Sequence, residues 1–337
     1  MTGPLTYRGA GVDIDAATRF LDAIGAVVRS THGPGVAAHG SQFAGLIRPE
    51  GWEQMGSPLI AATCDGVGTK VLLARRPEDF EGLGRDLVAM NVNDLLPVGA
   101  TPLLFLDYLA AGRLDPERLE AAVRGMAAAC LEAHCALLGG ETAEMPDALG
   151  DDQLEMAGFA VGLVDGDRLP TAALRPGDAV LALPATGLHA NGFSLARRAL
   201  LERGGFGLDD HVPELGRTLA EELLVPTPIY VDAVAHLLAG VEAKAMAHVT
   251  GGGLQGRGAA VVPEGLAMRI DPGSHPVPPV FDLIRACGEV DPAEMASTFN
   301  MGLGFLAVVP ADQAAVAGWL HVGEIVDGEG AERVAIG

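Results

Sequence analysis

The chain of 337 residues has very little lysine: Lys70 and Lys244 are the only two among its 22 basic residues, and arginine supplies the rest. Its formal net charge is -22, and no stripe of Lys and Arg offsets the acidic residues. This shortage of positive charge disfavours nucleic acid or an anionic membrane surface as a partner. Any phosphorylated ligand is therefore expected to arrive together with cations.

Cysteines and long apolar runs are also scarce. No two cysteines form a CxxC pair, and the first 20 residues contain no apolar signal-peptide core. Hydrophobic residues make up 49% of the chain, yet no apolar run approaches the length of about 18 residues that a membrane span needs. These absences predict a reduced, cytoplasmic protein.

The length predicts two domains, because 337 residues exceed what one core comfortably organises. We place the boundary near residue 168, which gives a domain at 1–167 and a domain at 168–337. In the first domain the patterns predict strands at 59–64, 102–109, 136–138 and 156–164, and helices at 83–98 and 116–132. In the second they predict strands at 179–183, 244–249, 266–270, 304–309 and 321–326, and helices near 193–203, 227–239 and 278–286.

The run DGVGTK, residues 65–70, directly follows the first of these strands. Gly66 and Gly68 let backbone N–H groups approach an anion, while Asp65 points at a metal. A compact ammonium at Lys70 suits a phosphate oxygen better than a planar guanidinium does. The run is not a P-loop, because GxxxxGK[ST] is absent. It favours a phosphate site, although a glycine-rich turn with one Asp is more often only a turn.

Two further acidic positions follow other elements. Asp94, after Asn93, lies late in the helix at 83–98, and Glu141 follows two glycines after the strand at 136–138. If these acids converge with the one in DGVGTK, their hard oxygen ligands suit Mg²⁺ carrying nucleotide phosphates. The alternatives are a helix C-terminal cap in the first case and, in the second, a pair with Glu144 in the first turn of a helix.

Two glycine-rich loops in the second half carry histidines. HANGFS at 189–194 and HVTGGG at 248–253 each follow a strand. The triple glycine opens a helix and is either a phosphate cradle or a flexible connector. His189 and His248 are candidates for a general base or a substrate hydrogen-bond donor, unless they are merely exposed loop residues.

Six motifs, in this order and spacing, resemble the phosphoribosylformylglycinamidine cyclo-ligase family. They are YRGAGVDIDAA (7–17), DGVGTK (65–70), DLLPVGATP (94–102), GGETAEMP (139–146), HANGFS (189–194) and HVTGGG (248–253). The resemblance covers nearly the whole chain. It implies an α+β fold of two domains that binds ATP, with N-terminal sheets pairing into a barrel across a homodimer and a C-terminal α/β sandwich domain.

The resemblance also implies an ATP- and Mg²⁺-dependent enzyme of purine biosynthesis. It would phosphorylate the formyl oxygen of formylglycinamidine ribonucleotide and close the imidazole ring, giving aminoimidazole ribonucleotide, ADP and phosphate. The implied metal ligands are Asp65, Asp94 and Glu141, and the catalytic candidates are Lys70, His189 and His248. The implied ATP-binding residues are Asp65, Gly66, Gly68, Thr69, Asn93, Asp94, Gly139, Gly140, Glu141 and Thr142. The implied substrate-binding residues are His189, Asn191, Ser194, Thr250, Gly251, Gly252 and Gly253.

One stretch departs from the family. Members resemble one another in a glycine-crowded loop, GGxGGFG, where this chain reads HGSQFAG at 39–45. We still expect residues 33–46 to cover bound nucleotide, as a stiffer lid. A selenophosphate synthetase is disfavoured because the first cysteine is Cys64, and a hydrogenase-maturation dehydratase because the chain ends in Gly337. A catalytically silent nucleotide-binding regulator and a small-molecule kinase or synthetase relative stay open.

Overall fold

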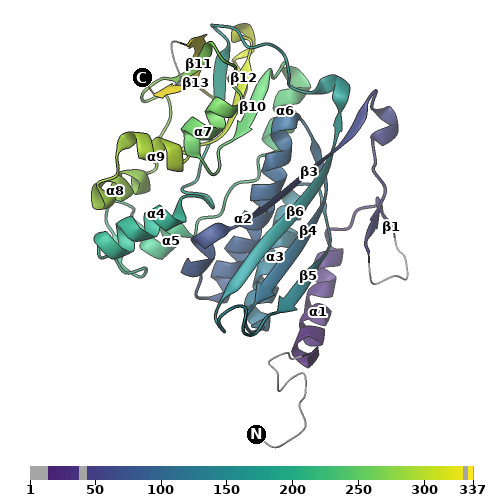
Figure 1. Ribbon diagram of the computed structural model, residues 1–337. Helices are drawn as coiled ribbons and strands as arrows, with labels where there is room; N and C mark the ends of the chain where they lie inside the picture. Colours follow the sequence, from purple (N-terminus) through teal and green to yellow (C-terminus); the bar gives the residue numbers. More distant parts are fainter. Residues whose placement is uncertain (1–13, 38–43, 329–332, 337) are drawn as a thin grey trace, which may run out of the picture.

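The computed structural model describes residues 14–37, 44–328 and 333–336, and two sheets organise these residues (Figure 1). A four-stranded sheet, in the order β3-β6-β4-β5, lies before residue 168. A six-stranded sheet, in the order β10-β12-β7-β13-β11-β14, lies after it. Each half of the chain therefore contains its own sheet.

The first sheet is covered on one face by helices. Its strands are β3 (Pro58–Gly66), β4 (Thr101–Ala111), β5 (Ala136–Glu144) and β6 (Leu154–Asp165), and its helices are α1 (Ile14–Arg29), α2 (Pro77–Leu95) and α3 (Pro116–Glu132). α3 has the predicted bounds, because Asp115 accepts a hydrogen bond from the N–H of Arg118 and Pro116 occupies the first turn. α2 begins six residues before the predicted start at 83, since Pro77 opens it and Asp79 accepts hydrogen bonds from two preceding N–H groups.

β5 is longer than predicted. The residues GGETAE, expected to form a loop after a short strand, continue the strand to Glu144. They do so because β4 and β5 pair in parallel, from the pair Leu104 and Ala136 to the pair Ala111 and Glu144. The prediction of a glycine-rich loop there is wrong.

The other face of this sheet is apolar and carries no helix among the described residues. Ile60 on β3 is 65% exposed and Phe159 on β6 is 41% exposed. The pairing places Cys64, Phe159 and Leu106 side by side across three strands, and all three are exposed. An open apolar sheet face of this kind is unusual for a monomer.

The second sheet is buried between helices and loops. Its strands are β7 (Ala179–Pro184), β10 (Ala245–His248), β11 (Leu266–Ile270), β12 (Leu303–Val309), β13 (Leu320–Asp327) and β14 (Val334–Ile336). α6 (Val231–Gly240) and α7 (Gly253–Ala260) pack on it. A separate apolar cluster is formed by α4 (Phe193–Arg197), the π-helical turn η6 (Arg198–Arg203), α5 (Leu219–Leu223), α8 (Pro279–Gly288) and α9 (Pro292–Thr298). Its pairs are antiparallel except β11 with β14.

Short elements complete the described chain. They are β1 (Val36–Ala37), β2 (Leu46–Ile47), β8 (His211–Val212), β9 (Arg217–Thr218) and the 3₁₀ helices η2 (Trp52–Gln54), η3 (Gly68–Leu73), η4 (Leu96–Val98), η5 (Gly166–Arg168) and η7 (Ala311–Gln313). No helix among the described residues is long and apolar enough to cross a membrane.

α2 joins the two halves. One continuous apolar core contains Val88 and Val92 of α2, Val234 of α6 and Phe305 of β12. Figure 1 shows α2 running behind the four-stranded sheet toward α6 and the second sheet. The C-terminal end of α2 is therefore the place where residues of both halves meet.

Candidate functional site

Asp65 lies at the end of β3 and is held there by α2. The side-chain amide of Asn91 accepts a hydrogen bond from the Asp65 N–H (2.9 Å) and donates to its carbonyl (3.2 Å). The N–H of Gly66 donates to Asp65 Oδ1 at 2.7 Å. Burial raises the pKa of Asp65, the Gly66 bond lowers it, and the nearby charge of Asp94 raises it further. Two carboxylates are therefore brought together, as predicted.

Asp94 contacts a histidine of the second half. Its Oδ1 lies 2.7 Å from Nδ1 of His248, the last residue of β10. A carboxylate only accepts, so Nδ1–H of His248 donates to Asp94. The His248 ring stacks on Phe305 with centroids 6.3 Å apart. Its Nε2 is buried and has no hydrogen-bond partner among the described residues.

His189 lies beside this pair, in a left-handed backbone conformation with φ of 61°. Its Nε2 accepts a hydrogen bond from the N–H of Thr186 at 3.3 Å, so Nδ1 carries the proton. Burial lowers the pKa of His189 well below its usual value, and the charges of His248 and Lys70 act in the same direction. His189 is thus a neutral donor whose Nδ1 is buried without a partner among the described residues.

The glycine loop after His248 supplies a third unpaired group. Oγ1 of Thr250 is also buried and without a partner among the described residues. Gly253 opens α7 with φ of 61°, and a Cβ there would lie 2.4 Å from the carbonyl oxygen of Ala296, so only glycine fits. A buried polar atom left unpaired costs about 1–3 kcal/mol, so these three atoms need partners such as a bound ligand or water.

Contacts also join the three motifs DGVGTK, HANGFS and HVTGGG. A Cβ added to Gly251 would meet Asn191 Oδ1 at 3.5 Å, which places the two glycine-rich loops side by side. The hydroxyls of Thr69 and Ser194 are 3.2 Å apart. DGVGTK therefore touches HANGFS across the two halves of the chain.

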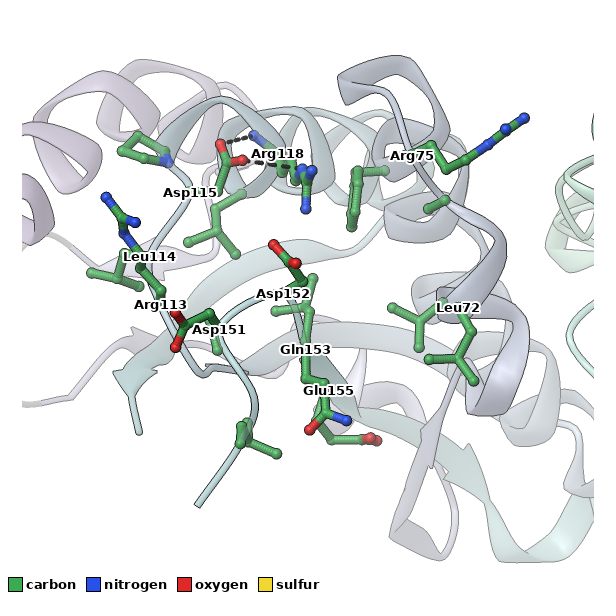
Figure 2. Close-up of a pocket in the computed structure, with 18 of the residues that line it drawn as sticks. Leu72, Arg75, Arg113, Leu114, Asp115, Arg118, Asp151, Asp152, Gln153 and Glu155 are labelled. Atoms are coloured by element: carbon green, nitrogen blue, oxygen red, sulfur yellow. Dashed lines mark hydrogen bonds and ion pairs between the residues drawn. The ribbon is translucent and has the colours of Figure 1, made fainter. Parts of the chain in front are cut away.

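A cavity of about 910 Å³ opens beside Gly68 and Thr69. Val71, Phe80 and other apolar side chains line part of it, within the size range of small-molecule sites. Figure 2 shows its charged residues, which come from the start of α2, the start of α3 and the segment leading into β6: Arg75, Arg113, Asp115, Arg118, Asp151, Asp152 and Glu155. Sequence reasoning missed all of these, since no motif links them.

Lys70 is not free to bind a phosphate. Its ammonium is fully buried and lies 2.6 Å from Asp86 Oδ2. It also donates to the carbonyl oxygens of His189 (2.9 Å) and Val225 (2.8 Å). These contacts use all three N–H groups of the ammonium. They contradict the predicted contact between Lys70 and phosphoryl oxygens.

Asn93 is likewise occupied. Its amide donates to the carbonyl oxygen of Pro228 at 2.8 Å and accepts from the N–H of Tyr230 at 2.9 Å, and the side chain is buried. The predicted contact between Asn93 and ATP is therefore contradicted. Its role is to fasten the segment before α6 to α2.

Glu141 does not join the two aspartates within one chain. The strand pairing places Glu141 in the same row of paired residues across the sheet as Gly66. The two residues are three strands apart, which is about 14 Å at the usual strand spacing. Gly139, Gly140 and Thr142 lie with it on β5. No group of three or more His, Cys, Asp or Glu residues among those described is placed to hold a metal. The three acids therefore do not meet within one chain, and their convergence at a metal stays a prediction.

Residues 38–43 of the predicted lid lie outside the described residues. On either side of them, β1 and β2 pair antiparallel, with Val36 opposite Ile47. The lid role stays a prediction.

Comparisons with known proteins show the family of the chain. The family described as AIR synthase related protein matches with its N-terminal domain at residues 44–164 and its C-terminal domain at 175–333. A relative named phosphoribosylformylglycinamidine cyclo-ligase, from Sorangium cellulosum (strain So ce56), is 47% identical over 308 residues, covering 90% of this chain and 88% of the relative. Another of that name, from Symbiobacterium thermophilum (strain DSM 24528 / JCM 14929 / IAM 14863 / T), is 46% identical and covers 98% of both chains.

Solved structures share the fold. Thiamine-monophosphate kinase from Stenotrophomonas maltophilia K279a superposes with a TM-score of 0.67 at 21% identity, covering 93% of this chain and 95% of that one. The hydrogenase maturation protein HypE in complex with ATP gives 0.60 at 19% identity, covering 92% and 86%. Identities this low show the fold alone, whereas the relatives above show the family. The chain belongs to the phosphoribosylformylglycinamidine cyclo-ligase family.

Proposed function

We propose that the chain is an ATP-dependent cyclo-ligase of purine biosynthesis, which converts formylglycinamidine ribonucleotide and ATP to aminoimidazole ribonucleotide, ADP and phosphate. The observation that carries this proposal is the hydrogen-bonded pair of Asp94 and His248, which leaves the buried His248 Nε2 without a partner among the described residues, near the carboxylate of Asp65. Ring closure needs a proton acceptor close to a site of phosphoryl transfer, and this pair supplies one.

Asp65 and Asp94 fit a Mg²⁺–ATP complex. Each has one oxygen in a protein hydrogen bond, and the second oxygen of each has no partner among the described residues. Their mutual repulsion would be relieved by a cation, and Mg²⁺ commonly uses one or two carboxylates together with nucleotide phosphates. When bound, Mg²⁺ would neutralise charge on the transferring phosphoryl group.

The remaining groups would position the substrate. The Nδ1–H of His189 is suited to donate to an oxygen of the formyl group or its phosphorylated form, because the ring stays neutral. Gly251 and Gly252 precede α7, so their N–H groups and the helix N-terminus suit the ribose phosphate. His248 Nε2 would accept the proton released as the nitrogen attacks the activated carbon. Positioning and electrostatics would supply most of the rate.

We further propose a homodimer that meets through the open face of the four-stranded sheet. The apolar side chains of Ile60, Leu106 and Phe159 support this contact. Glu141 points to the same open face, so a dimer would bring it to a partner chain. The predicted nucleotide role of residues 139–142 therefore depends on the second copy.

Phosphate release from ATP, measured with and without formylglycinamidine ribonucleotide, tests the function. We expect release only with the ribonucleotide, in equal amount to aminoimidazole ribonucleotide formed. A silent nucleotide-binding protein would release none, and a kinase would transfer phosphate to a stable product. Either result would refute the proposal.

A further inference from the structure

Both lysines of the chain end in ion pairs with an aspartate inside the protein. Lys70 Nζ lies 2.6 Å from Asp86, with both side chains fully buried. Lys244 Nζ lies 2.7 Å from Asp178, with side-chain exposures of 10% and 8%. The scarcity of lysine thus marks buried ammonium sites, where a compact charge with three donors is needed.

The pair of Lys70 and Asp86 bridges the two halves of the chain. Lys70 on η3 donates to the carbonyl oxygens of His189 and Val225, and Asp86 Oδ1 accepts from the N–H (2.8 Å) and hydroxyl (2.7 Å) of Thr227. All four bonds run from the first half to the second. They attach the HANGFS loop and the segment before α6 to α2 and DGVGTK.

One of these bonds holds the backbone of a site residue. The His189 carbonyl that Lys70 binds belongs to a residue with φ of 61°, a conformation that needs support from its surroundings. The ring of the same residue presents Nδ1 to the site. Moving this carbonyl would therefore turn or shift the ring.

Stability alone does not account for this pair. Apolar residues of similar volume are often as stable as a buried ion pair, because removing two charges from water is costly. Burial accordingly lowers the pKa of Lys70, and Asp86 opposes the shift. Phe193, whose ring centre lies 5.6 Å from Nζ, helps to enclose the ammonium.

We propose that the Lys70–Asp86 pair is a positioning device, which fixes the His189 loop against DGVGTK so that both face the same ligands. Lys70 then acts through the carbonyl of His189 and does not touch nucleotide phosphate. The pair of Lys244 and Asp178 lies within the second half, between β10 and the turn before β7, and is the matched control.

The experiment compares two double variants, Lys70→Met/Asp86→Leu and Lys244→Met/Asp178→Leu. Each removes one buried ion pair and leaves no unpaired charge. Three measurements are made on each: hydrogen exchange of the amides at 186–192, the Kd of a non-hydrolysable ATP analogue with Mg²⁺, and kcat. If the first variant fails to fold, the isosteric Asp86→Asn takes its place.

Faster exchange at 186–192, by about tenfold in the Lys70 variant only, would support the proposal, with kcat lowered about tenfold and the nucleotide Kd within about threefold of the original. A nucleotide Kd raised more than about thirtyfold, with unchanged loop exchange, would overturn it and make Lys70 a phosphate ligand. Unchanged exchange and unchanged kcat would overturn it too. The kcat and Kd measurements rest on the proposed function, whereas the exchange at 186–192 does not. If the original protein proves inactive, the exchange measurement still decides the proposal.

Discussion

The two edges of the four-stranded sheet carry similar motifs but use them differently. At the β3 edge, Asn91 holds Asp65 by hydrogen bonds to its N–H and carbonyl, and Asp65 lies beside Asp94 and His248. At the β5 edge, Glu141 follows two glycines and is exposed on the open face. An acidic glycine motif therefore becomes a site only where a second element supplies partners, and in the proposed dimer the partner chain would supply that element at β5.

The largest effect is expected from Asp94→Asn. We expect kcat to fall by at least about a hundredfold with folding retained, because the variant weakens both Mg²⁺ binding and the charge that supports protonated His248. Steady-state kinetics with a Mg²⁺ titration measures this. Asp232→Asn is the matched control, since Asp232 pairs with His134 at 2.8 Å on the surface. Full activity at ordinary Mg²⁺ concentrations would show that Asp94 is not part of the site.

Glu141→Gln tests whether the β5 edge takes part. If a partner chain brings Glu141 to the nucleotide, kcat should fall about tenfold, whereas Glu120→Gln on the exposed side of α3 should change nothing. Mixing this variant with Asp94→Asn sharpens the test. If each site combines Asp94 of one chain with Glu141 of the other, mixed dimers would regain activity. A lack of recovery would mean that Glu141 lies outside the site or belongs to the site of its own chain.

Phe159→Asp tests the open face itself. Burying a charge in an apolar contact is unfavourable, so we expect the dimer to dissociate at micromolar concentration. Light scattering measures the mass, and Leu131→Asp, another exposed apolar position on α3, is the control. A monomeric original protein, or a variant that stays dimeric, would show that this face is not the contact.

The smallest effect concerns Asp107, which lies on β4 against Gly140. Burial raises the pKa of Asp107 to about 7, and the charge of Glu141 adds to the shift. The folded protein then binds this proton more tightly than the unfolded chain, so stability falls as pH rises from about 4 to about 7. Asp107→Asn should stabilise the protein at pH 8 by about 1 kcal/mol after allowance for solvent screening, with little effect near pH 4.

Urea unfolding at the two pH values measures this difference. Asp152→Asn, at an exposed position beside the cavity, should show no such dependence. An equal effect of Asp107→Asn at both pH values would mean that Asp107 keeps an ordinary pKa.

Local signals predicted most regular elements of the described chain. α3 matches its predicted bounds because an N-cap Asp and a first-turn Pro mark its start. β11 at 266–270 also matches. β5 was mispredicted because its glycines favour a loop, and only parallel pairing with β4 makes it a strand. α1 and several short elements were not predicted.

The site was predicted in part, for similar reasons. The motifs identified Asp65, Asp94, His189 and His248, which the fold brings together. They could not show that Asp86, 16 residues from Lys70, forms an ion pair with the Lys70 ammonium, because that pairing depends on the packing of η3 on α2. The charged residues of the cavity come from three separate segments, and no local pattern relates them.

α2 also sets a distance. Asn91 fastens it to the end of β3, and Asn93, two residues later, fastens it to residues 228–230. The helix therefore fixes the distance between the carboxylates and the histidines of the site. One residue inserted between the two asparagines would rotate everything after it by about 100°. It would separate the halves of the site while leaving each sheet intact, so we expect this stretch to tolerate substitutions on its surface but no change in length.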